Sequence, residues 1–200
     1  MAERPVEQSD VELVLASGSP RRRQLLGELG LPFRVVVSDV DESPLAGEPP
    51  RDLVLRLARA KAEAVAALAP NAVVVAADTI AVLDGEVLGK PIDEADAAAM
   101  LQRMSGTTHE VLTGVAVLAA GELQAEVAVS RVRFAPMTTA EITDYVATGE
   151  PLDKAGAYGI QGEADRFATL VDGAFDNVVG LPLALVRRLL ATAGITVTRT

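Results

Sequence analysis

Apolar residues along this chain of 200 residues follow two different periods. Short, continuous apolar runs have the length of buried β-strands and are separated by turn-forming residues. Asp84-Gly85 lies between two of these runs, which is the sequence signature of a tight hairpin. The predicted strands occupy residues 11–16, 33–37, 71–77, 80–83, 86–88, 111–118 and 123–134.

Other segments repeat apolar residues at helical spacing between recognisable capping residues. Ser19 is a suitable N-cap for the first of them, with Pro20 at its first helical position. Thr138 and Glu141 have the spacing of a capping box at the start of the fourth. The predicted helices lie between Ser19 and Gly30, from about Asp52 to Leu68, between Asp93 and Gly106, between Thr138 and Gly149, and from Leu183 to Leu190.

The order of these elements predicts the class of fold. Strands and helices interleave, but two pairs of neighbouring strands are joined by tight turns, so we expect an α/β fold with a mixed sheet rather than a purely parallel one. We expect a single domain over residues 11–193, with flexible tails at 1–10 and 194–200.

Composition and charge exclude several classes of site. The chain has no cysteine, which excludes disulfides, thiolate zinc sites, iron–sulfur clusters and cysteine nucleophiles. The single His109 cannot form a histidine-rich metal site, so any metal must be held mainly by carboxylates. The formal net charge of −10 argues against nonspecific nucleic-acid binding, which needs a broad basic face. Because no apolar run approaches the ~20 residues of a membrane span and no signal peptide is evident, we expect a cytoplasmic protein without a membrane partner.

The segment Ser17-Gly-Ser-Pro-Arg-Arg22 joins the first predicted strand to the first helix. The hydroxyls of Ser17 and Ser19, free backbone N–H groups at the helix N-terminus and the Arg22 guanidinium could converge there on one anion. The alternative is a well-capped helix with solvated arginines, but cations in the first turn oppose the helix dipole. The segment therefore predicts a phosphate-binding loop, although it matches neither the Walker nor the dinucleotide-binding motif.

Candidate carboxylates lie on two other segments. Asp78 follows the apolar run 71–77, and we expect it at the carboxyl end of a strand, where α/β sheets bind their ligands. Asp39, Asp41 and Glu42 share one acidic loop that could help to hold a hard divalent cation, although such loops are more often simply solvated.

Two further segments offer contacts to a ligand. Lys90 follows the predicted hairpin and could reach a phosphate as a point charge. The glycine-rich segment 152–162 allows backbone to approach a ligand closely, and its Gln161 could read a base edge through both a donor and an acceptor. We assign no role to His109 or Met104, because such residues are more often found in the core or on the surface.

Several motifs together resemble, in order, those of the Maf family of nucleotide pyrophosphatases, and the resemblance extends from about Val11 to Leu190. It implies an elongated α/β fold, with a central sheet flanked by helices and two lobes around a cleft, that is often dimeric. All three lysines of the chain, Lys61, Lys90 and Lys154, fall inside these motifs. The motifs are Ser17-Gly-Ser-Pro-Arg-Arg22, Arg59-Ala-Lys61-Ala, Ala77-Asp78-Thr79, Gly89-Lys90-Pro91, Lys154-Ala-Gly-Ala-Tyr-Gly-Ile-Gln-Gly162 and Asn177-Val-Val-Gly-Leu-Pro-Leu183.

The resemblance also implies roles for individual residues. Asp78 matches the general base of the family, and Glu42 matches the carboxylate linked to metal or water. These two residues are accordingly the expected ligands of a divalent cation, Mg²⁺ or Mn²⁺. Arg22, Lys61 and Lys90 match the cations that contact phosphate, with Lys61 and Lys90 counted among the catalytic residues.

Arg21, Thr79 and Gln161 resemble the specificity positions of the subgroup that prefers dTTP and UTP. The sequence departs from the family pattern at Asp41-Glu42, where a Glu-Glu pair is more usual, and at Glu163–Arg166, where glycines are more usual. We therefore expect a homodimeric nucleoside triphosphate pyrophosphatase that acts on dTTP and UTP, with modified pyrimidine nucleotides as further candidate substrates. Alternatives are a non-hydrolytic nucleotide-binding regulator of cell division, or the same chemistry on 7-methyl-GTP or a broad range of nucleotides.

Overall fold

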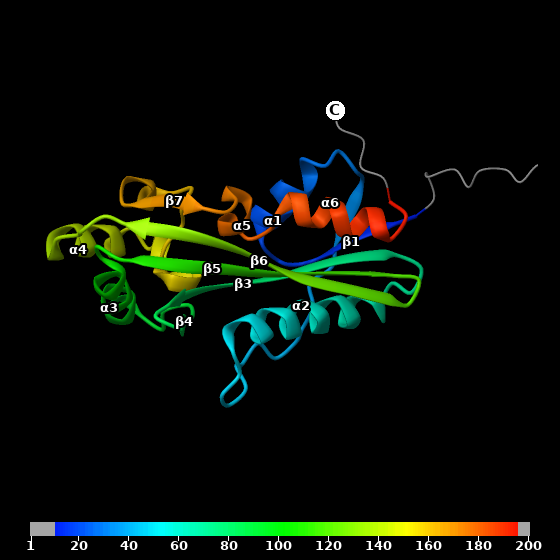
Figure 1. Cartoon of the computed structure of the whole chain (residues 1–200), viewed down its shortest axis with the longest axis horizontal. Coiled ribbons are helices and arrows are strands. Elements are labelled where there is room, and N and C mark those ends of the chain that lie inside the picture. The colour runs from blue at the N-terminus through cyan, green and yellow to red at the C-terminus, as the bar shows by residue number, and fades with distance from the viewer. Residues whose placement is uncertain (1–10, 196–200) are drawn as a thin grey trace, which may run out of the picture.

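A mixed sheet of seven strands forms the centre of the computed structural model, which describes residues 11–195 (Figure 1). The strand order is β2-β1-β3-β5-β6-β7, and β4 also pairs with β3. β1 is parallel to β2 and β3, whereas every other pair is antiparallel, which confirms the predicted mixed sheet. The strands are β1 (Leu13–Ala16), β2 (Phe33–Val35), β3 (Val73–Leu83), β4 (Glu86–Leu88), β5 (Thr108–Ala119), β6 (Glu122–Phe134) and β7 (Ala168–Asp172).

The helices begin where the predicted caps place them. Ser19 caps α1 by accepting a hydrogen bond from the backbone N–H of Arg22, and Thr138 and Glu141 form both halves of the predicted capping box. The α-helices are α1 (Pro20–Gly27), α2 (Pro50–Ala66), α3 (Glu94–Met104), α4 (Thr139–Ala147), α5 (Phe175–Val179) and α6 (Leu183–Thr192). Three short 3₁₀ helices follow α4: η1 (Glu150–Asp153), η2 (Ala155–Ala157) and η3 (Glu163–Arg166).

Helices cover both faces of the sheet around β1, which explains why its sequence is continuously apolar. Leu13 and Leu15 pack with the apolar residues of α1 and α6, whereas Val14 and Ala16 pack with those of α2. Successive side chains of a strand point to opposite faces, so one strand supplies two separate parts of the core. Figure 1 shows α2 on one side of the sheet and α1 with α6 on the other.

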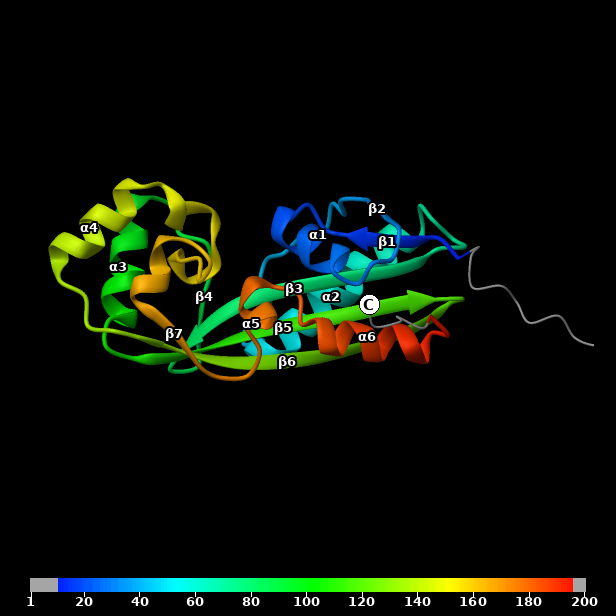
Figure 2. The same cartoon turned by 90° about the horizontal axis from the view of Figure 1, so that it is seen from above.

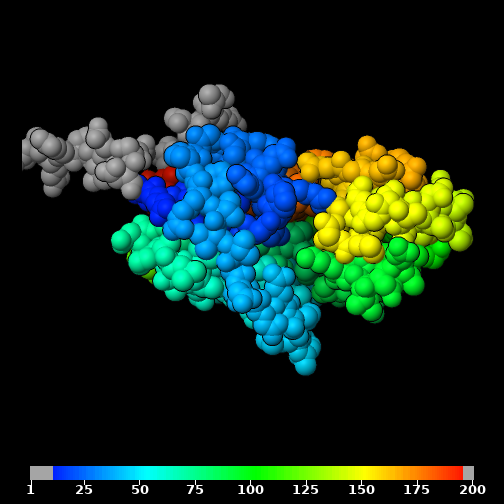
Figure 3. Space-filling view, turned by 180° about the vertical axis from the view of Figure 1, so that it is seen from behind, coloured from blue at the N-terminus to red at the C-terminus, as the bar shows by residue number. Residues whose placement is uncertain are grey.

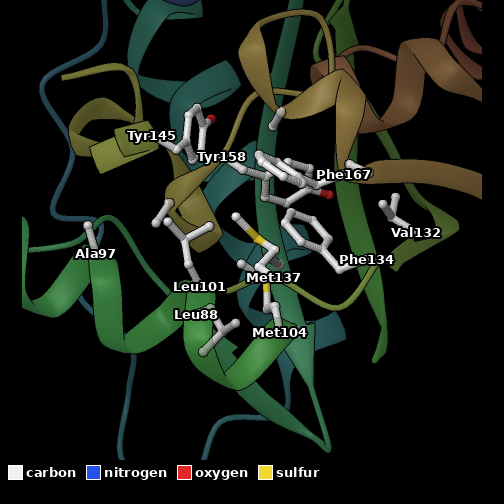
Figure 4. Packing of buried hydrophobic residues seen from close by; sticks show 14 of the residues in the cluster. Leu88, Ala97, Leu101, Met104, Val132, Phe134, Met137, Tyr145, Tyr158 and Phe167 are labelled. Carbon is white, nitrogen blue, oxygen red and sulfur yellow. The ribbon is translucent and has the colours of Figure 1, made fainter. Parts of the chain in front are cut away.

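A second apolar cluster fills the other end of the molecule. It contains Met104 of α3, Tyr145 of α4 and Phe134 at the end of β6, all completely buried (Figure 4). We call β1, β2, α1, α2 and α6 the first lobe, and β4, α3, α4, η1–η3 and β7 the second lobe. Figure 2 shows the long strands β3, β5 and β6 running through both, in agreement with the expected elongated, two-lobed sheet.

One edge of β3 is interrupted between the lobes. β1 pairs with β3 as far as Ala76, and β4 pairs with β3 only from Ala81 onward. Residues 77–80 therefore have no strand on that edge within the described part of the chain, although β5 pairs with them on the other edge. The interruption exposes the middle of a buried strand to the space between the lobes.

One sequence-based expectation is wrong, two elements were missed, and one expectation is not tested by the structure. Asp78 does not end a strand, because β3 continues through it to Leu83; the strand that ends beside it is β1. β7 and α5 were not predicted. The expected tails at 1–10 and 194–200 lie outside the described residues, except for Gly194 and Ile195. Among residues 11–195, no helix is long and apolar enough to cross a membrane.

Candidate active site

A cleft of about 670 Å³ lies where the two lobes meet beside the interrupted edge of β3. The first lobe contributes the β1–α1 loop and Lys61, and the second contributes Lys90 and the segment around η2. Ten residues predicted from the sequence line this cleft: Ser17, Ser19, Arg21, Arg22, Glu42, Lys61, Asp78, Thr79, Lys90 and Gln161.

The loop between β1 and α1 forms one wall of the cleft. Ser17, buried at the end of β1, accepts a hydrogen bond from the backbone N–H of Ser19 at 3.2 Å. Arg22 Nη1 lies 3.4 Å from the same Ser17 hydroxyl, so the arginine folds back over the loop. This wall therefore combines hydroxyls, the N-terminus of α1 and a guanidinium, as the sequence predicted for a phosphate-binding loop.

Lys61 lies between two carboxylates. Its Nζ atom is 2.6 Å from Oε1 of Glu42 and 2.6 Å from Oδ1 of Asp78. The side chains of Lys61 and Asp78 are only 8% and 10% exposed, whereas that of Glu42 is 56% exposed. One buried ammonium group thus holds a carboxylate from the sheet and one from a surface loop in the same place.

The alternation of side chains along β3 decides which helix each site residue meets. Val74 and Ala76 pack against the face covered by α2, so Asp78 points to the same face and meets Lys61 of α2. Thr79 points to the opposite face, where its Oγ1 lies 2.9 Å from Arg22 Nη2 of α1. The interrupted strand therefore presents one residue to each half of the site.

The loop between β2 and α2 carries Glu42 and projects from the body of the molecule (Figure 3). An ion pair from Glu48 to Arg56 of α2, at 2.6 Å, fixes the loop to the helix. Asp41 caps the backbone N–H of Ser43, and Asp39 does not line the cleft, so only Glu42 of the acidic residues on this loop reaches the site.

The charges of the cleft act on one another. Burial raises the pKa of Glu42, but the hydrogen bond and charge of Lys61, together with Lys90 and Arg22, outweigh it and hold that pKa below its usual value. Burial lowers the pKa of Arg22, and the charges of Asp78 and Glu42 oppose that change. Glu42 is therefore a carboxylate at neutral pH, and the site pairs anionic protein groups with several cations.

The second lobe forms the other wall. Lys90 is exposed just after β4, and Gln161 is exposed on the turn after η2. Lys154 is buried, and its Nζ donates to Asp153 Oδ1 and to the carbonyl of Glu150, each at 2.6 Å. Its charge is therefore already paired within the second lobe. This lysine holds the 3₁₀ segment in place.

Some residues of the site were not predicted. Tyr158 lines the cleft and bonds through its hydroxyl to Nε2 of buried His109 at 2.8 Å. Thr113 of β5 contacts Thr79, at 2.9 Å between their hydroxyl oxygens. In the sequence, Thr113 could be noticed only as a polar residue inside an apolar strand run. The pairing of β3 with β5 is what shows that it lies beside Thr79.

The chain is similar to several known proteins over most of its length. The chain is 60% identical over 187 residues to a "dTTP/UTP pyrophosphatase" of Anaeromyxobacter dehalogenans, covering 91% of this chain and 94% of the relative. It is 52% identical to a protein of the same name from Deinococcus radiodurans, covering 92% and 93% of the two chains. Among solved structures, a "Nucleoside-triphosphatase / dITP/XTP pyrophosphatase" from Mycobacterium abscessus matches with a TM-score of 0.45 and 16% identity, over 92% of this chain and 98% of that one.

A family described as "Maf-like protein" matches residues 12–193 of the sequence. That range contains the whole sheet and every residue that lines the cleft. The chain therefore belongs to the Maf-like protein family.

Proposed function

We propose that this chain hydrolyses dTTP and UTP to the nucleoside monophosphate and pyrophosphate. Relatives at 50–60% identity that carry the name "dTTP/UTP pyrophosphatase" support this activity. The observation that carries the proposal is the placement of Asp78 and Glu42 on Lys61, directly beside the phosphate-binding loop in one cleft. A protein that only bound nucleotide would not need this pair of carboxylates next to its phosphate-binding cations.

The reaction follows from the arrangement of charges. A water oxygen attacks the α-phosphorus, the bond from that phosphorus to the α–β bridging oxygen breaks, and its electron pair leaves with pyrophosphate. Asp78 takes the proton of the water, since its Oδ2 makes no hydrogen bond within the described residues. Lys61 keeps Asp78 and Glu42 oriented toward the cleft.

The cations of the cleft bind the polyphosphate. Arg22 and the N-terminus of α1 approach it from the first lobe, and Lys90 approaches it from the second. These groups neutralise the negative charge that builds on pyrophosphate as it leaves. They contact phosphates, which every nucleotide shares, and so contribute to the rate rather than to base choice.

The same carboxylates suit a divalent cation. Mg²⁺ is commonly bound by one or two carboxylates together with substrate phosphates, and Lys61 contacts only Oε1 of Glu42 and Oδ1 of Asp78. Residues 11–195 contain no group of three or more His, Cys, Asp or Glu side chains suited to a metal, so Glu42 and Asp78 are the candidate ligands. Such a cation would withdraw charge from the phosphate oxygens when bound.

Base choice is assigned to both walls of the cleft, through Arg21 of the first lobe and Gln161 of the second. Arg21 and Gln161 line it, and neither side chain makes a hydrogen bond within the described residues, so both can meet a base. Uracil and thymine present two carbonyl acceptors around one N–H donor, whereas cytosine replaces a carbonyl by an amino donor. An unmatched buried polar group costs about 1–3 kcal/mol, which predicts a preference of roughly ten- to a hundredfold for UTP over CTP.

Product analysis on a panel of nucleotides tests the activity. Incubation with dTTP, UTP, CTP, GTP and 7-methyl-GTP in the presence of Mg²⁺ or Mn²⁺ should release monophosphate and pyrophosphate from dTTP and UTP fastest. Release of diphosphate and orthophosphate as first products would contradict the proposal. Tight nucleotide binding without any turnover would favour a regulatory protein instead. The homodimer and the cytoplasmic location stay predictions.

Replacement of Gln161 by Ala tests the base-reading assignment separately. Because Gln161 is not among the ion-pair partners of Lys61, Gln161→Ala should narrow the ratio of UTP to CTP turnover without abolishing hydrolysis. Gln24→Ala, at an exposed position of α1 that does not line the cleft, is the matched control. Unchanged ratios in Gln161→Ala would remove this residue from base recognition.

A further inference from the structure

The hydroxyl of Thr79 is already engaged by the protein. Its Oγ1 lies 2.9 Å from Nη2 of Arg22 and 2.9 Å from Oγ1 of Thr113. Thr79 belongs to the motif that resembles a base-specificity signature, yet these contacts join it to a phosphate-binding arginine. The direction of each hydrogen bond shows what the hydroxyl can still offer to a ligand.

The donors and acceptors around Thr79 can be assigned in one order. Thr113 Oγ1 donates its single proton to the backbone carbonyl of Asn177 at 3.0 Å, so it can only accept from Thr79. Thr79 therefore donates its own proton to Thr113 and accepts from Arg22 Nη2, because a guanidinium cannot accept. The Gly180 carbonyl, at 3.5 Å, is a second protein acceptor for the Thr79 proton. That proton is therefore directed to the protein, and one lone pair of Thr79 Oγ1 remains able to accept a hydrogen bond.

The contacts of Arg22 complete the arrangement. Its Nε donates to the carbonyl of Gly180 at 2.8 Å, and its Nη2 donates to Thr79, so two protein acceptors hold one side of the guanidinium plane. Nη1 reaches Ser17 Oγ at 3.4 Å. Of the five N–H groups of an arginine, one on each terminal nitrogen is then left without a partner among residues 11–195. Such a pair matches two oxygens of one phosphate.

The far end of this chain of hydrogen bonds is fixed in the core. Asn177 and Thr113 are completely buried, and Asn177 Nδ2 donates to the Val111 carbonyl at 3.1 Å and to Ser130 Oγ at 2.9 Å. α5 is thereby attached to β5 and β6, and its C-cap is Gly180, whose carbonyl accepts from Arg22 Nε. Gly180 has φ +120°, and a Cβ atom there would lie 3.3 Å from both Arg22 Nε and Thr79 Oγ1, so this contact needs a glycine.

We propose that Thr79 and Thr113 are positioning residues for Arg22. The buried Asn177 carbonyl orients Thr113, Thr113 orients Thr79, and Thr79 with Gly180 fixes the guanidinium plane toward the phosphates. This inference rests on the proposed function, since it assigns a substrate group to Arg22.

Kinetics of isosteric variants test the inference. Thr79→Val and Thr113→Val keep the shape of the side chain and remove the hydroxyl. Both should lower kcat/KM by roughly 10- to 100-fold, because small displacements of a substrate-binding group have effects of that size. Thr113 does not line the cleft, so Thr113→Val should lower kcat/KM for dTTP, UTP and CTP by one common factor. Thr79→Ser and Thr113→Ser keep the hydroxyl and should recover most of the activity. Undiminished kcat/KM in Thr113→Val, or a loss confined to one of the three nucleotides in that variant, would overturn the inference.

Two controls separate positioning from a loss of stability. Ser105→Ala removes a partly buried hydroxyl that bonds to the backbone of Met137 in the second lobe, away from the cleft. It should lower the melting temperature without changing kcat/KM. An equal loss of kcat/KM in Ser105→Ala, or no recovery in the serine variants, would mean that the valine variants act through stability alone, against the inference.

Pyrophosphate binding measured by calorimetry makes the result independent of turnover. Thr79→Val and Thr113→Val should weaken pyrophosphate binding by a similar factor, whereas Gln161→Ala should leave it unchanged. If the parent protein binds pyrophosphate in this hydroxyl-dependent way but hydrolyses no nucleotide, the proposed function fails and the positioning role stands. Equal affinity in the parent and both valine variants, or no binding by the parent, would overturn the positioning role.

Discussion

A single ammonium group shared by two carboxylates dominates the electrostatics of the candidate site. Lys61 Nζ lies 2.6 Å from oxygens of both Glu42 and Asp78, and the lysine and aspartate are buried. Removal of one partner from a buried ion pair leaves an uncompensated charge, which is strongly destabilising. Here Glu42 still pairs with Lys61 when Asp78 is neutralised. A loss of activity in an Asp78 variant can therefore be attributed to the missing carboxylate rather than to unfolding.

Asp78→Asn keeps the size of the side chain and removes its ability to take a proton. We expect kcat to fall by roughly 10²-fold or more, the usual scale for loss of a general base, while nucleotide still binds. Steady-state kinetics with dTTP and nucleotide binding by calorimetry are the measurements. Asp41→Asn, at an exposed position of the loop that carries Glu42, is the control and should retain its activity. Near-normal turnover in folded Asp78→Asn would remove Asp78 from the mechanism.

His109 makes the stability of the fold depend on pH. Burial lowers its pKa from 6.5 to about 4, so between these values the unfolded chain binds a proton that the folded chain does not. Stability should therefore fall as the pH drops from about 6.5 toward 4, by up to about 3 kcal/mol from this group.

Urea unfolding of the parent and His109→Gln at several pH values isolates this contribution. The chain has a single histidine, so the difference between the two proteins over that pH range belongs to His109. His109→Gln should show the shallower dependence, since its side chain does not titrate. Parallel curves for the two proteins would show that His109 does not titrate in this way.

The arrangement of the elements around β3 could be predicted only in part. The period of apolar residues correctly placed most strands and helices, but the polar pair Asp78-Thr79 interrupts that period and suggested that the strand ends there. The strand continues because β5 pairs with it throughout, and that partner is remote in sequence. β7 and α5 were missed because each has only five residues and β7 is largely exposed, so neither has a clear apolar period.

The site residues themselves could be predicted because they lie in short motifs, and these motifs fall on the β1–α1 loop, in α2, in β3, after β4 and around η2. The contacts among them could not be predicted. The pairing of Thr79 with Thr113 depends on the register of β3 against β5, and that of Lys61 with Asp78 depends on how α2 crosses the sheet. Both arise from packing between distant segments, which local sequence does not encode.

The close approach of α2 to β5 gives a prediction about these elements. Gly114 pairs directly with Asp78, and a Cβ atom on Gly114 would lie 2.6 Å from the carbonyl carbon of Val54 in α2. Backbone atoms cannot yield as a flexible side chain can, so Gly114→Ala should displace α2. Overpacking of this kind typically destabilises by about 1–3 kcal/mol. Because Lys61 lies on the same helix, turnover should fall as well.

Chemical unfolding and dTTP kinetics of Gly114→Ala measure both effects. Gly27→Ala is the matched control: it lies in α1, its Cβ would meet nothing within 4 Å, and alanine favours a helix by up to about 1 kcal/mol over glycine. Stability of Gly114→Ala equal to that of the parent would mean that α2 adjusts to the added methyl group without cost.

At the scale of the whole molecule, the two lobes share their strands. β5 and β6 are paired continuously from Ala119 and Glu122 at one end to Thr108 and Arg133 at the other (Figure 2). Loss of one lobe would therefore expose apolar residues of strands that also form the core of the other. This shared sheet also sets the width of the cleft, since both of its walls are attached to β3.

We therefore expect both lobes to unfold in one cooperative transition. The chain has no tryptophan and two tyrosines, Tyr145 and Tyr158, and both lie in the apolar cluster of the second lobe. Tyrosine fluorescence consequently reports the second lobe, whereas far-ultraviolet circular dichroism reports the whole sheet and its helices. In a urea titration the two signals should give the same midpoint. Gly114→Ala is strained against α2 in the first lobe and should move both midpoints equally, because the strands carry the destabilisation into the second lobe. A tyrosine midpoint that stays in place while the circular dichroism midpoint falls would show that the lobes unfold separately, and that the shared strands do not couple them.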